Sequence, residues 1–270
     1  MASFLQVKRR LSLLVGWAAD RRVPRFLRAP LYRTYAGLTG ADLSEMRGRP
    51  TDHACFGAFF VRRLADGVRP IEPDPGLLVS PTDSMVQASS PITDGAVIEA
   101  KGRTYPIEDL LDGMGAGMDL EGGHQVTLYL GPKDYHRIHC PIDADLVESR
   151  HVPGERFSVQ PRVLARHRVL PVNERVVCRL ESEHGTFFMV LVGAMIVGRI
   201  RVVGVDPLHR GPIEPPRHFV RGEEFGRFEM GSTVVLLTPR GFLSPLPSAT
   251  EGETVRMGQA IARLGEQATS

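Results

Sequence analysis

The sequence predicts an α+β fold, in which a mostly antiparallel β core, barrel-like or sandwich-like, follows an N-terminal helical cap. Two observations predict it. Over residues 1–76, apolar residues recur at helical spacing between basic ones. From residue 77 onward, short apolar runs are separated by Gly and Pro, which is typical of strands joined by turns. We therefore expect a helical region, residues 1–76, and a β-rich domain, residues 77–270.

The first predicted helix is amphipathic. Its apolar residues fall on one stripe, with Trp17 beside it: Phe4, Val7, Leu11, Leu14 and Ala18. Residues 1–33 carry eight Lys and Arg residues against the single acid Asp20. Two interpretations remain open. The segment is either a helical hairpin packed on the core, with its arginines solvated, or a membrane-associating cap whose apolar face enters lipid while its arginines meet anionic headgroups.

The remaining elements follow from the pattern of apolar runs. A second helical stretch is expected within residues 56–70, before a Pro-rich boundary at residues 69–76. Strands are expected at residues 77–81, 95–100, 124–132, 174–181, 187–198 and 232–239, with one short helix within 106–114. The tail, residues 252–265, has an apolar–Gly–apolar pattern that predicts a hairpin pairing near the strand that begins at Ser232.

Composition narrows the class of protein. The 270 residues are 42% hydrophobic and 24% charged, which is ordinary for a globular chain, and the net charge is +2. Three scattered cysteines are too few for a disulfide framework and indicate a reducing compartment. No secretory signal is recognisable, and no apolar run reaches the ~20 residues that a membrane-spanning helix needs.

A small step, Gly231-Ser232-Thr233, precedes the apolar run at residues 234–237. The simplest interpretation is a turn, since glycine and serine are common where a strand begins. The alternative is chemical. A serine hydroxyl can attack the preceding carbonyl if a base takes its proton, so a Gly-Ser bond can cleave itself.

The segment GPKDYHRIHCP, residues 131–141, supplies candidate bases in His136 and His139. In a regular strand, residues three apart face opposite sides, whereas a turn between the flanking prolines would aim both rings at one pocket. Three interpretations remain: a zinc site with the adjacent Cys140, structural histidines bonded to backbone, or acid–base catalysis near neutral pH.

Asp83 follows a predicted strand and a Pro-Thr turn in LLVSPTDSMVQAS. An aspartate at such a place commonly bonds its own backbone. It is also suited to orienting an imidazole, as the acid does in a Ser-His-Asp triad.

Together these elements resemble one family, the phosphatidylserine decarboxylase proenzymes of the longer bacterial type. The similarity extends over nearly the whole chain, through FGAFFVRRLADGVRPIEPDP, LLVSPTDS, LYLGPKDYHRIHCP, VPGERFSV, NERVVC, VLVGAMIVG and GEEFGRFEMGSTVVLL. The Asp-Tyr-His-Arg-x-His and Gly-Ser-Thr elements are specific in this combination and order.

The resemblance implies a role for each candidate. Ser232 becomes an N-terminal pyruvoyl group, with Gly231 on the other side of the cleaved bond. Asp83 and His139 match the acid and base of self-processing, and His136 matches a histidine of the decarboxylation. The products are a β chain, residues 1–231, and an α chain, residues 232–270, held as a heterodimer. One departure is Ser84, where the family usually has glycine after the aspartate.

The resemblance further implies the chemistry and the partners. The covalent pyruvoyl group forms a Schiff base with phosphatidylserine, which loses carbon dioxide and leaves phosphatidylethanolamine, without a metal. We expect an anionic membrane surface as a partner and no nucleic acid, and we expect the protein at the cytoplasmic side of the cell membrane as a peripheral protein.

Two other functions are weighed against this one. The residues Ser232, His139 and Asp83 also suit a serine hydrolase triad, although the Gly-x-Ser-x-Gly elbow is absent. A non-catalytic lipid-binding or carrier-like β module is the second alternative. Self-cleavage distinguishes both from a proenzyme, because either one would persist as a single chain.

Overall fold

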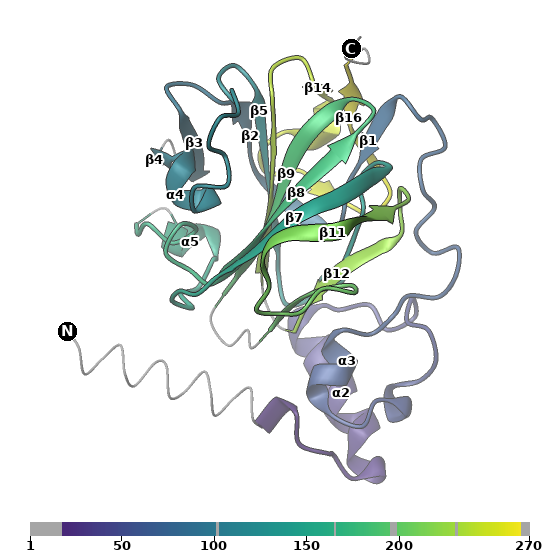
Figure 1. Cartoon of the computed structure of the whole chain (residues 1–270). Helices are drawn as coiled ribbons and strands as arrows, with labels where there is room; N and C mark the ends of the chain where they lie inside the picture. The colour runs from purple at the N-terminus through teal and green to yellow at the C-terminus, as the bar shows by residue number, and fades with distance from the viewer. Residues whose placement is uncertain (1–17, 101–102, 165, 195–198, 230–231, 266–270) are drawn as a thin grey trace, which may run out of the picture.

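The computed structural model describes residues 18–100, 103–164, 166–194, 199–229 and 232–265. Its centre is an eight-stranded antiparallel sheet in the order β11-β7-β8-β9-β13-β5-β2-β15 (Figure 1). The strands are β2 (Ser84–Pro91), β5 (His124–Leu130), β7 (Ala144–Val152), β8 (Arg175–Ser182), β9 (Gly185–Gly193), β11 (Arg210–Phe219), β13 (Ser232–Thr238) and β15 (Thr254–Val255).

The large sheet has two edges, β11 and β15, and so the described strands do not close into a barrel. The barrel-like form of the prediction is therefore wrong, and the sandwich-like form agrees better with the layers. Two three-stranded sheets supply the second layer. They are β1-β16-β14, with bounds Leu77–Val79, Ala260–Leu264 and Leu243–Pro245, and β10-β12-β6, with bounds Ile200–Val202, Glu224–Phe228 and Arg137–His139.

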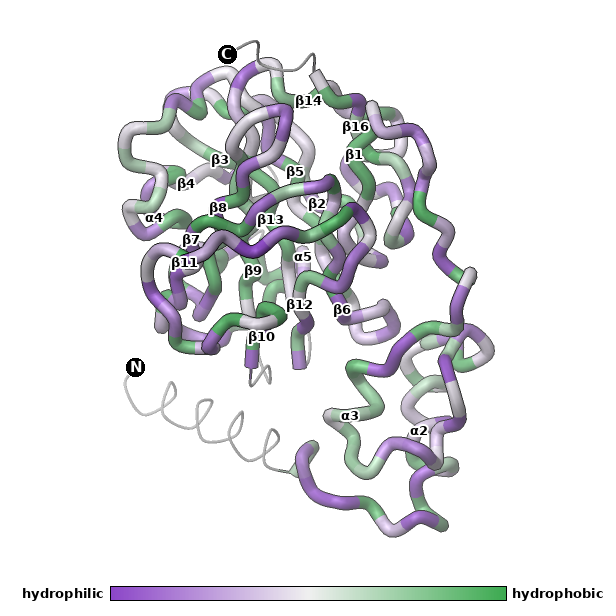
Figure 2. Tube along the Cα trace, turned by 45° about the vertical axis from the view of Figure 1, so that its right-hand side comes forward, coloured by the Kyte–Doolittle hydropathy of each residue, from purple (hydrophilic) through white to green (hydrophobic). Residues whose placement is uncertain are grey.

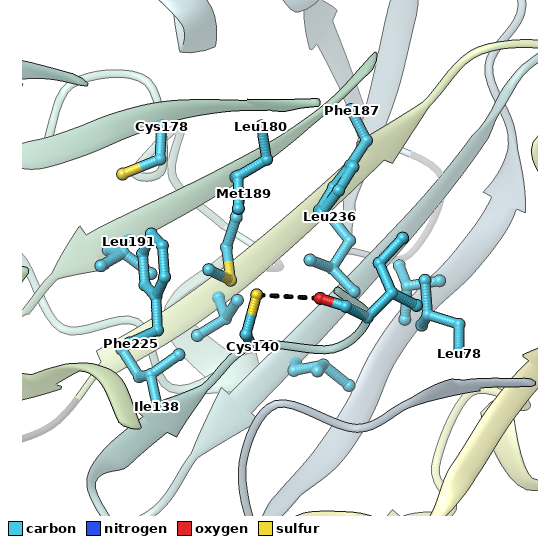
Figure 3. Close-up of a cluster of buried hydrophobic side chains, with 14 of the residues drawn as sticks. Leu78, Ile138, Cys140, Cys178, Leu180, Phe187, Met189, Leu191, Phe225 and Leu236 are labelled. Atoms are coloured by element: carbon cyan, nitrogen blue, oxygen red, sulfur yellow. Dashed lines mark hydrogen bonds between the residues drawn. The ribbon is translucent and has the colours of Figure 1, made fainter. Parts of the chain in front are cut away.

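Each face of the large sheet buries its own apolar core. One core joins the large sheet to the two small sheets, as Figure 3 shows for Ile138, Phe225 and Leu236. The other lies under β3 (Ala96–Ala100), β4 (Arg103–Pro106), α4 (Ile107–Leu111) and α5 (Pro161–Leu164). Apolar residues accordingly concentrate in the inner strands of Figure 2.

Strand β13 lies between β9 and β5 and is buried along its whole length. Val234 and Leu236 belong to one core, and Val235 and Leu237 belong to the other. This double burial explains why the run at residues 234–237 is continuously apolar rather than alternating.

The N-terminal part contains α2 (Arg25–Thr39), η1 (Pro50–Asp52) and α3 (Phe56–Phe60). An aromatic cluster joins them, in which the Tyr32 and Phe59 rings stack with centroids 4.4 Å apart. The helices lie beyond one end of the sandwich in Figure 1 and contact it where the Tyr35 hydroxyl donates to the Pro132 carbonyl, at 2.6 Å.

Several predicted elements are confirmed, among them the strands at 77–81, 95–100, 124–132, 174–181 and 232–239 and the short helix within 106–114. The helical stretch predicted within 56–70 is wrong beyond Phe60, where α3 ends. The predicted pairing of the tail with the strand that begins at Ser232 is also wrong. Strand β15 pairs with β2, and β16 pairs with β1 and β14.

The predictions for residues 1–17 concern a part of the chain that the structure does not describe. The stripe from Phe4 to Leu14, and Trp17, lie outside the described residues. Within the described part, no helix combines the length and the apolar character needed to cross a membrane. The membrane-associating cap and the division at residue 76 therefore stay predictions.

Candidate active site

Ser232 is the first residue of β13 and pairs with Leu130 of β5 and Gly193 of β9. Its side chain is completely buried, and the hydroxyl has no hydrogen-bond partner among the described residues. A buried hydroxyl without a partner carries an uncompensated desolvation cost. Gly231, on the other side of the predicted cleaved bond, lies outside the described residues.

Strand alternation sets the direction of the Ser232 side chain. Residues two apart in a strand share a face, and Val234 belongs to the core that also holds Ile138 and Phe228. The Ser232 hydroxyl therefore faces the layer that contains β6 and β12. The candidate histidines lie in that layer.

His136 directly precedes β6 and is fully buried. Its Nδ1 donates to the Asp134 carbonyl at 2.8 Å, and this bond leaves Nε2 as the nitrogen with the free lone pair. Nε2 has no partner among the described residues. The ring packs against Phe60 with centroids 4.2 Å apart, and burial lowers the pKa of His136 to about 3. The ring is therefore neutral and able to accept a proton at Nε2.

His139 has both ring nitrogens engaged. Its Nδ1 donates to the Gly222 carbonyl at 2.7 Å, and its Nε2 accepts from the Tyr135 hydroxyl at 3.2 Å. Burial lowers the pKa of His139, so this ring is also neutral near pH 7. The Tyr135 hydroxyl would have to move before His139 could accept a proton at Nε2.

The two rings have different hydrogen-bond partners. Ile138, between them, packs into the core below the large sheet, and alternation along β6 then sets His139 on the opposite face. A backbone hydrogen bond from Phe228 N–H to the His136 carbonyl, 3.0 Å, ties His136 to the segment four residues before Ser232. The alternative in which a turn aims both rings at one pocket stays a prediction.

Asp83 directly precedes β2. Met85 near the start of β2 and Thr233 near the start of β13 both pair with Tyr129 of β5, so Asp83 lies at the same end of the large sheet as Ser232. The Asp83 carboxylate is held by Arg69, whose Nε and Nη2 donate at 2.9 and 2.6 Å, and by the Met257 N–H at 2.9 Å. The expected hydrogen bond from Asp83 to His139 is not among the described contacts. The Gly222 carbonyl sets the tautomer of His139 instead.

The described residues contain no group of three or more His, Cys, Asp and Glu side chains placed to hold a metal ion. Cys140, the third member of the zinc alternative, donates to the Ile142 carbonyl at 3.0 Å, and burial raises the pKa of its thiol to about 12. Figure 3 shows this thiol among apolar side chains. Cys140 therefore behaves as a core residue.

Comparison with known proteins gives the family. The family model for phosphatidylserine decarboxylase matches residues 56–263. The chain is 37% identical to the phosphatidylserine decarboxylase proenzyme of Erwinia tasmaniensis, over 94% of this chain and 90% of the relative. It is 38% identical to that of Pseudomonas fluorescens, with 93% and 92% covered, and 37% identical to that of Marinobacter nauticus, with 94% and 93% covered. The chain belongs to the phosphatidylserine decarboxylase family.

This membership confirms the resemblance found in the motifs and makes the chain a decarboxylase, an enzyme. Two residues of this chain that contact the candidates carry no signal recognised in the sequence. Tyr135 lies between Asp134 and His136, in a segment already noted for its histidines. Arg69 is fourteen residues from Asp83, and no local spacing signals their contact.

Ser84 stands where the resemblance leads us to expect glycine after the aspartate. It is buried, and its hydroxyl has no partner among the described residues. It continues directly into β2, pairing with Val255 of β15. The strand therefore accommodates a side chain at this position without leaving the ladder.

Proposed function

We propose that this chain is a self-processing phosphatidylserine decarboxylase that converts phosphatidylserine to phosphatidylethanolamine and carbon dioxide. The observation that supports it most is the buried, unpartnered hydroxyl of Ser232 at the start of a central strand, facing the layer that holds two neutral histidines. Family membership supplies the class of reaction.

The cleavage uses only groups of the chain and water. A base takes the Ser232 proton, and the oxygen attacks the Gly231 carbonyl, converting the peptide bond into an ester. Loss of the Ser232 α-proton then breaks the ester, leaving a carboxylate on Gly231 and dehydroalanine at position 232. One water enters and one ammonia leaves, which converts the dehydroalanine to a pyruvoyl group.

We assign the base to His139, as the resemblance implies. The hydrogen bond to the Gly222 carbonyl, and then the charges of Glu224 and Asp83, raise the pKa of His139 against the larger effect of burial. His136 is assigned to proton transfer during decarboxylation. Its unpartnered Nε2 makes it the competing candidate for the first role. Variants of the two rings separate these assignments, as described in the Discussion.

The residues around position 232 fit a pyruvoyl group. The Ser232 side chain is small, buried and free of hydrogen-bond partners among the described residues. No hydrogen bond of this side chain therefore has to be broken when the pyruvoyl group forms. Once formed, that group supplies Schiff-base chemistry, in which its ketone condenses with the substrate amine and takes up the electron pair that carbon dioxide leaves. The surrounding core would exclude water from this position.

We also propose that the N-terminal region binds an anionic membrane surface, which makes the enzyme a peripheral protein of the cytoplasmic side of the cell membrane. On α2, Leu27, Leu31 and Leu38 fall on one face and are 46%, 45% and 83% exposed. Arg25 and Arg33 are exposed on the same helix. Exposed leucines beside arginines are suited to a headgroup boundary.

Carbon dioxide release tests this function. Purified protein should release it from phosphatidylserine in mixed micelles, and a carbonyl reagent such as hydroxylamine should abolish the release. Added pyridoxal phosphate should not restore it. Release that hydroxylamine leaves unchanged would contradict a pyruvoyl group. A serine hydrolase would instead release fatty acid and no carbon dioxide.

A further inference from the structure

A basic pocket of about 560 Å³ lies between α3 and the β6-β12-β10 sheet. This volume is within the range of small-molecule sites. Two acidic side chains, Asp20 and Glu229, line it together with six arginines. The arginines are Arg47, Arg62, Arg63, Arg137, Arg199 and Arg227.

The basic pocket has fewer carboxylates around it than guanidinium groups. A single carboxylate, Glu224, is shared by Arg63, Arg137 and Arg227. Arg199 is paired with Asp20 and Glu229. Among the described residues, Arg47 forms one ion pair, with the exposed Asp66 at 3.7 Å. Four carboxylates thus face six arginines, so the pocket retains positive charge for an anion.

Arg62 is the arginine that this arrangement leaves without a carboxylate. It is only 3% exposed, and its one described hydrogen bond is a long one, 3.4 Å from Nη2 to the Lys133 carbonyl. Its Nε has no partner in the part of the chain that the structure describes, and its guanidinium lies over the Phe59 ring, 5.5 Å from the centroid. Burial of an arginine without an ion pair is costly, which indicates a ligand that supplies the missing charge.

The charge of Arg62 interacts with three carboxylates, those of Asp83, Glu45 and Asp134, and two of these are held by another arginine. Asp83 and Glu45 oppose the lowering of the Arg62 pKa that burial causes, but both accept hydrogen bonds from Arg69. Neither forms an ion pair with Arg62 among the described residues. The Arg62 side chain therefore remains available to an anion that enters the pocket.

One residue of the basic pocket, Arg62, lies close enough to the candidate active site for its charge to act on the His136 ring. Arg62 follows α3, whose Phe60 packs on the His136 ring. Arg137, which lines the pocket, is the residue after His136. Glu229, also in the lining, is three residues before Ser232. A headgroup bound at Arg62 would thus be near His136.

We propose that this pocket binds the phosphodiester of the phospholipid headgroup, with Arg62 as the residue that determines its affinity. The proposal rests on the function proposed above. A guanidinium fork matches the oxygens of a phosphate. The headgroup carboxylate is a poorer partner, because it leaves as carbon dioxide, and a cation bound to it would stabilise the ground state more than the transition state.

Binding of glycerophosphoserine, the deacylated headgroup, tests the proposal on the full chain. All variants are made with Ser232→Ala, so that binding is measured without processing or turnover. We expect Arg62→Gln and Arg62→Met to weaken binding about 10- to 100-fold in titration calorimetry, since each loses charge-assisted hydrogen bonds. Arg263→Gln, an exposed arginine on β16 outside the pocket, should bind as the parent does. Free serine, which lacks the phosphate, should bind far more weakly.

Thermal unfolding separates a ligand-binding role from a structural one. Without ligand, Arg62→Met should keep or raise the unfolding midpoint, because it removes a buried unpaired charge; a marked fall would make Arg62 a structural residue and overturn the proposal. Equal binding by the Arg62 variants and the parent would overturn it too. Arg62-dependent binding of serine as strong as that of glycerophosphoserine would assign the pocket to the carboxylate instead. Because Ser232→Ala neither cleaves nor turns over, these results do not depend on whether the proposed reaction occurs.

Discussion

Two histidines three residues apart have different environments in this chain, and variants of each separate their roles. His139→Ala should leave the chain whole, because self-cleavage loses its assigned base. His136→Ala should still cleave, at least in part, and its turnover should fall by about 10²–10⁴-fold, the usual contribution of a positioned acid–base group. Intact mass, followed by carbon dioxide release, measures both effects.

The opposite cleavage result in these two variants would mean that His136 and His139 have each other's assigned roles. If His136→Ala stays whole while His139→Ala cleaves, then the free Nε2 of His136 is the base that takes the Ser232 proton. Full activity of a cleaved His136→Ala enzyme would remove His136 from the decarboxylation.

Arg69 is expected to hold Asp83 in position. Their side chains are only 6% and 13% exposed, so removing one partner leaves a largely buried charge. In a Ser232→Ala background, Arg69→Gln should lower the free energy of unfolding by about 3 kcal/mol. The double variant Arg69→Gln/Asp83→Asn should lose less than the sum of the two single changes. Additive losses in denaturant titrations would show that the pair is not coupled.

Buried His136 makes the fold sensitive to acid. Its pKa falls from 6.5 to about 3 on folding, so the unfolded chain binds more protons between these values. The free energy of unfolding then drops as the pH falls through this window, by up to about 1.4 kcal/mol per pH unit. His136→Gln should flatten this dependence.

Asp134 provides a control of opposite sign. Burial raises its pKa from 3.8 to about 6, so the folded chain binds the extra proton and gains stability as the pH falls. Asp134→Asn should therefore make the acid loss steeper. Denaturant titrations of Ser232→Ala variants between about pH 4 and 6.5 measure both slopes; an unchanged slope in His136→Gln would contradict the assigned pKa shift.

At the scale of elements, the pairing of β13 in the large sheet should keep the two chains together after cleavage. The α chain, residues 232–270, would contribute β13 to the centre of the large sheet and β15 and β16 to other pairings. We expect the two chains to elute together in gel filtration and to separate only in denaturant. Release of the 39-residue chain, residues 232–270, under native conditions would contradict this topology.

The elements differ in how well the sequence predicts them. Runs rich in Val, Leu and Phe, such as residues 187–193 and 232–238, predict buried strands because both faces need apolar residues. The short strand β6, with Arg137 and His139, has no such run.

For the candidate site, the sequence identifies Ser232, His136 and His139. It does not show that Asp83 contacts Arg69, because that contact depends on how the loops before β2 fold back.

At the scale of the whole molecule, the exposed leucines of α2 and the basic N-terminus should decide where the enzyme acts. Leu31→Ser/Leu38→Ser should weaken sedimentation with anionic vesicles by about tenfold or more, since each leucine loses its transfer into lipid. Binding by the parent should also weaken as salt rises, because exposed charges are screened over ~8 Å at physiological ionic strength.

Leu208→Ser is the matched control, since Leu208 is 69% exposed and belongs to the segment between β10 and β11, not to α2. It should bind vesicles as the parent does. If binding is equal for neutral and anionic vesicles at every salt concentration, the arginines serve packing rather than the membrane.

The most direct measurement for the whole account is the intact mass of the purified chain beside its Ser232→Ala variant. We expect two chains from the parent, of 231 and 39 residues, with the smaller one blocked to N-terminal sequencing. Their summed mass should equal that of the uncleaved chain plus one water minus one ammonia. Ser232→Ala should remain a single inactive chain of 270 residues. A cleaved Ser232→Ala chain, or an intact parent that releases carbon dioxide from phosphatidylserine, would contradict the central claim that Ser232 generates the catalytic group.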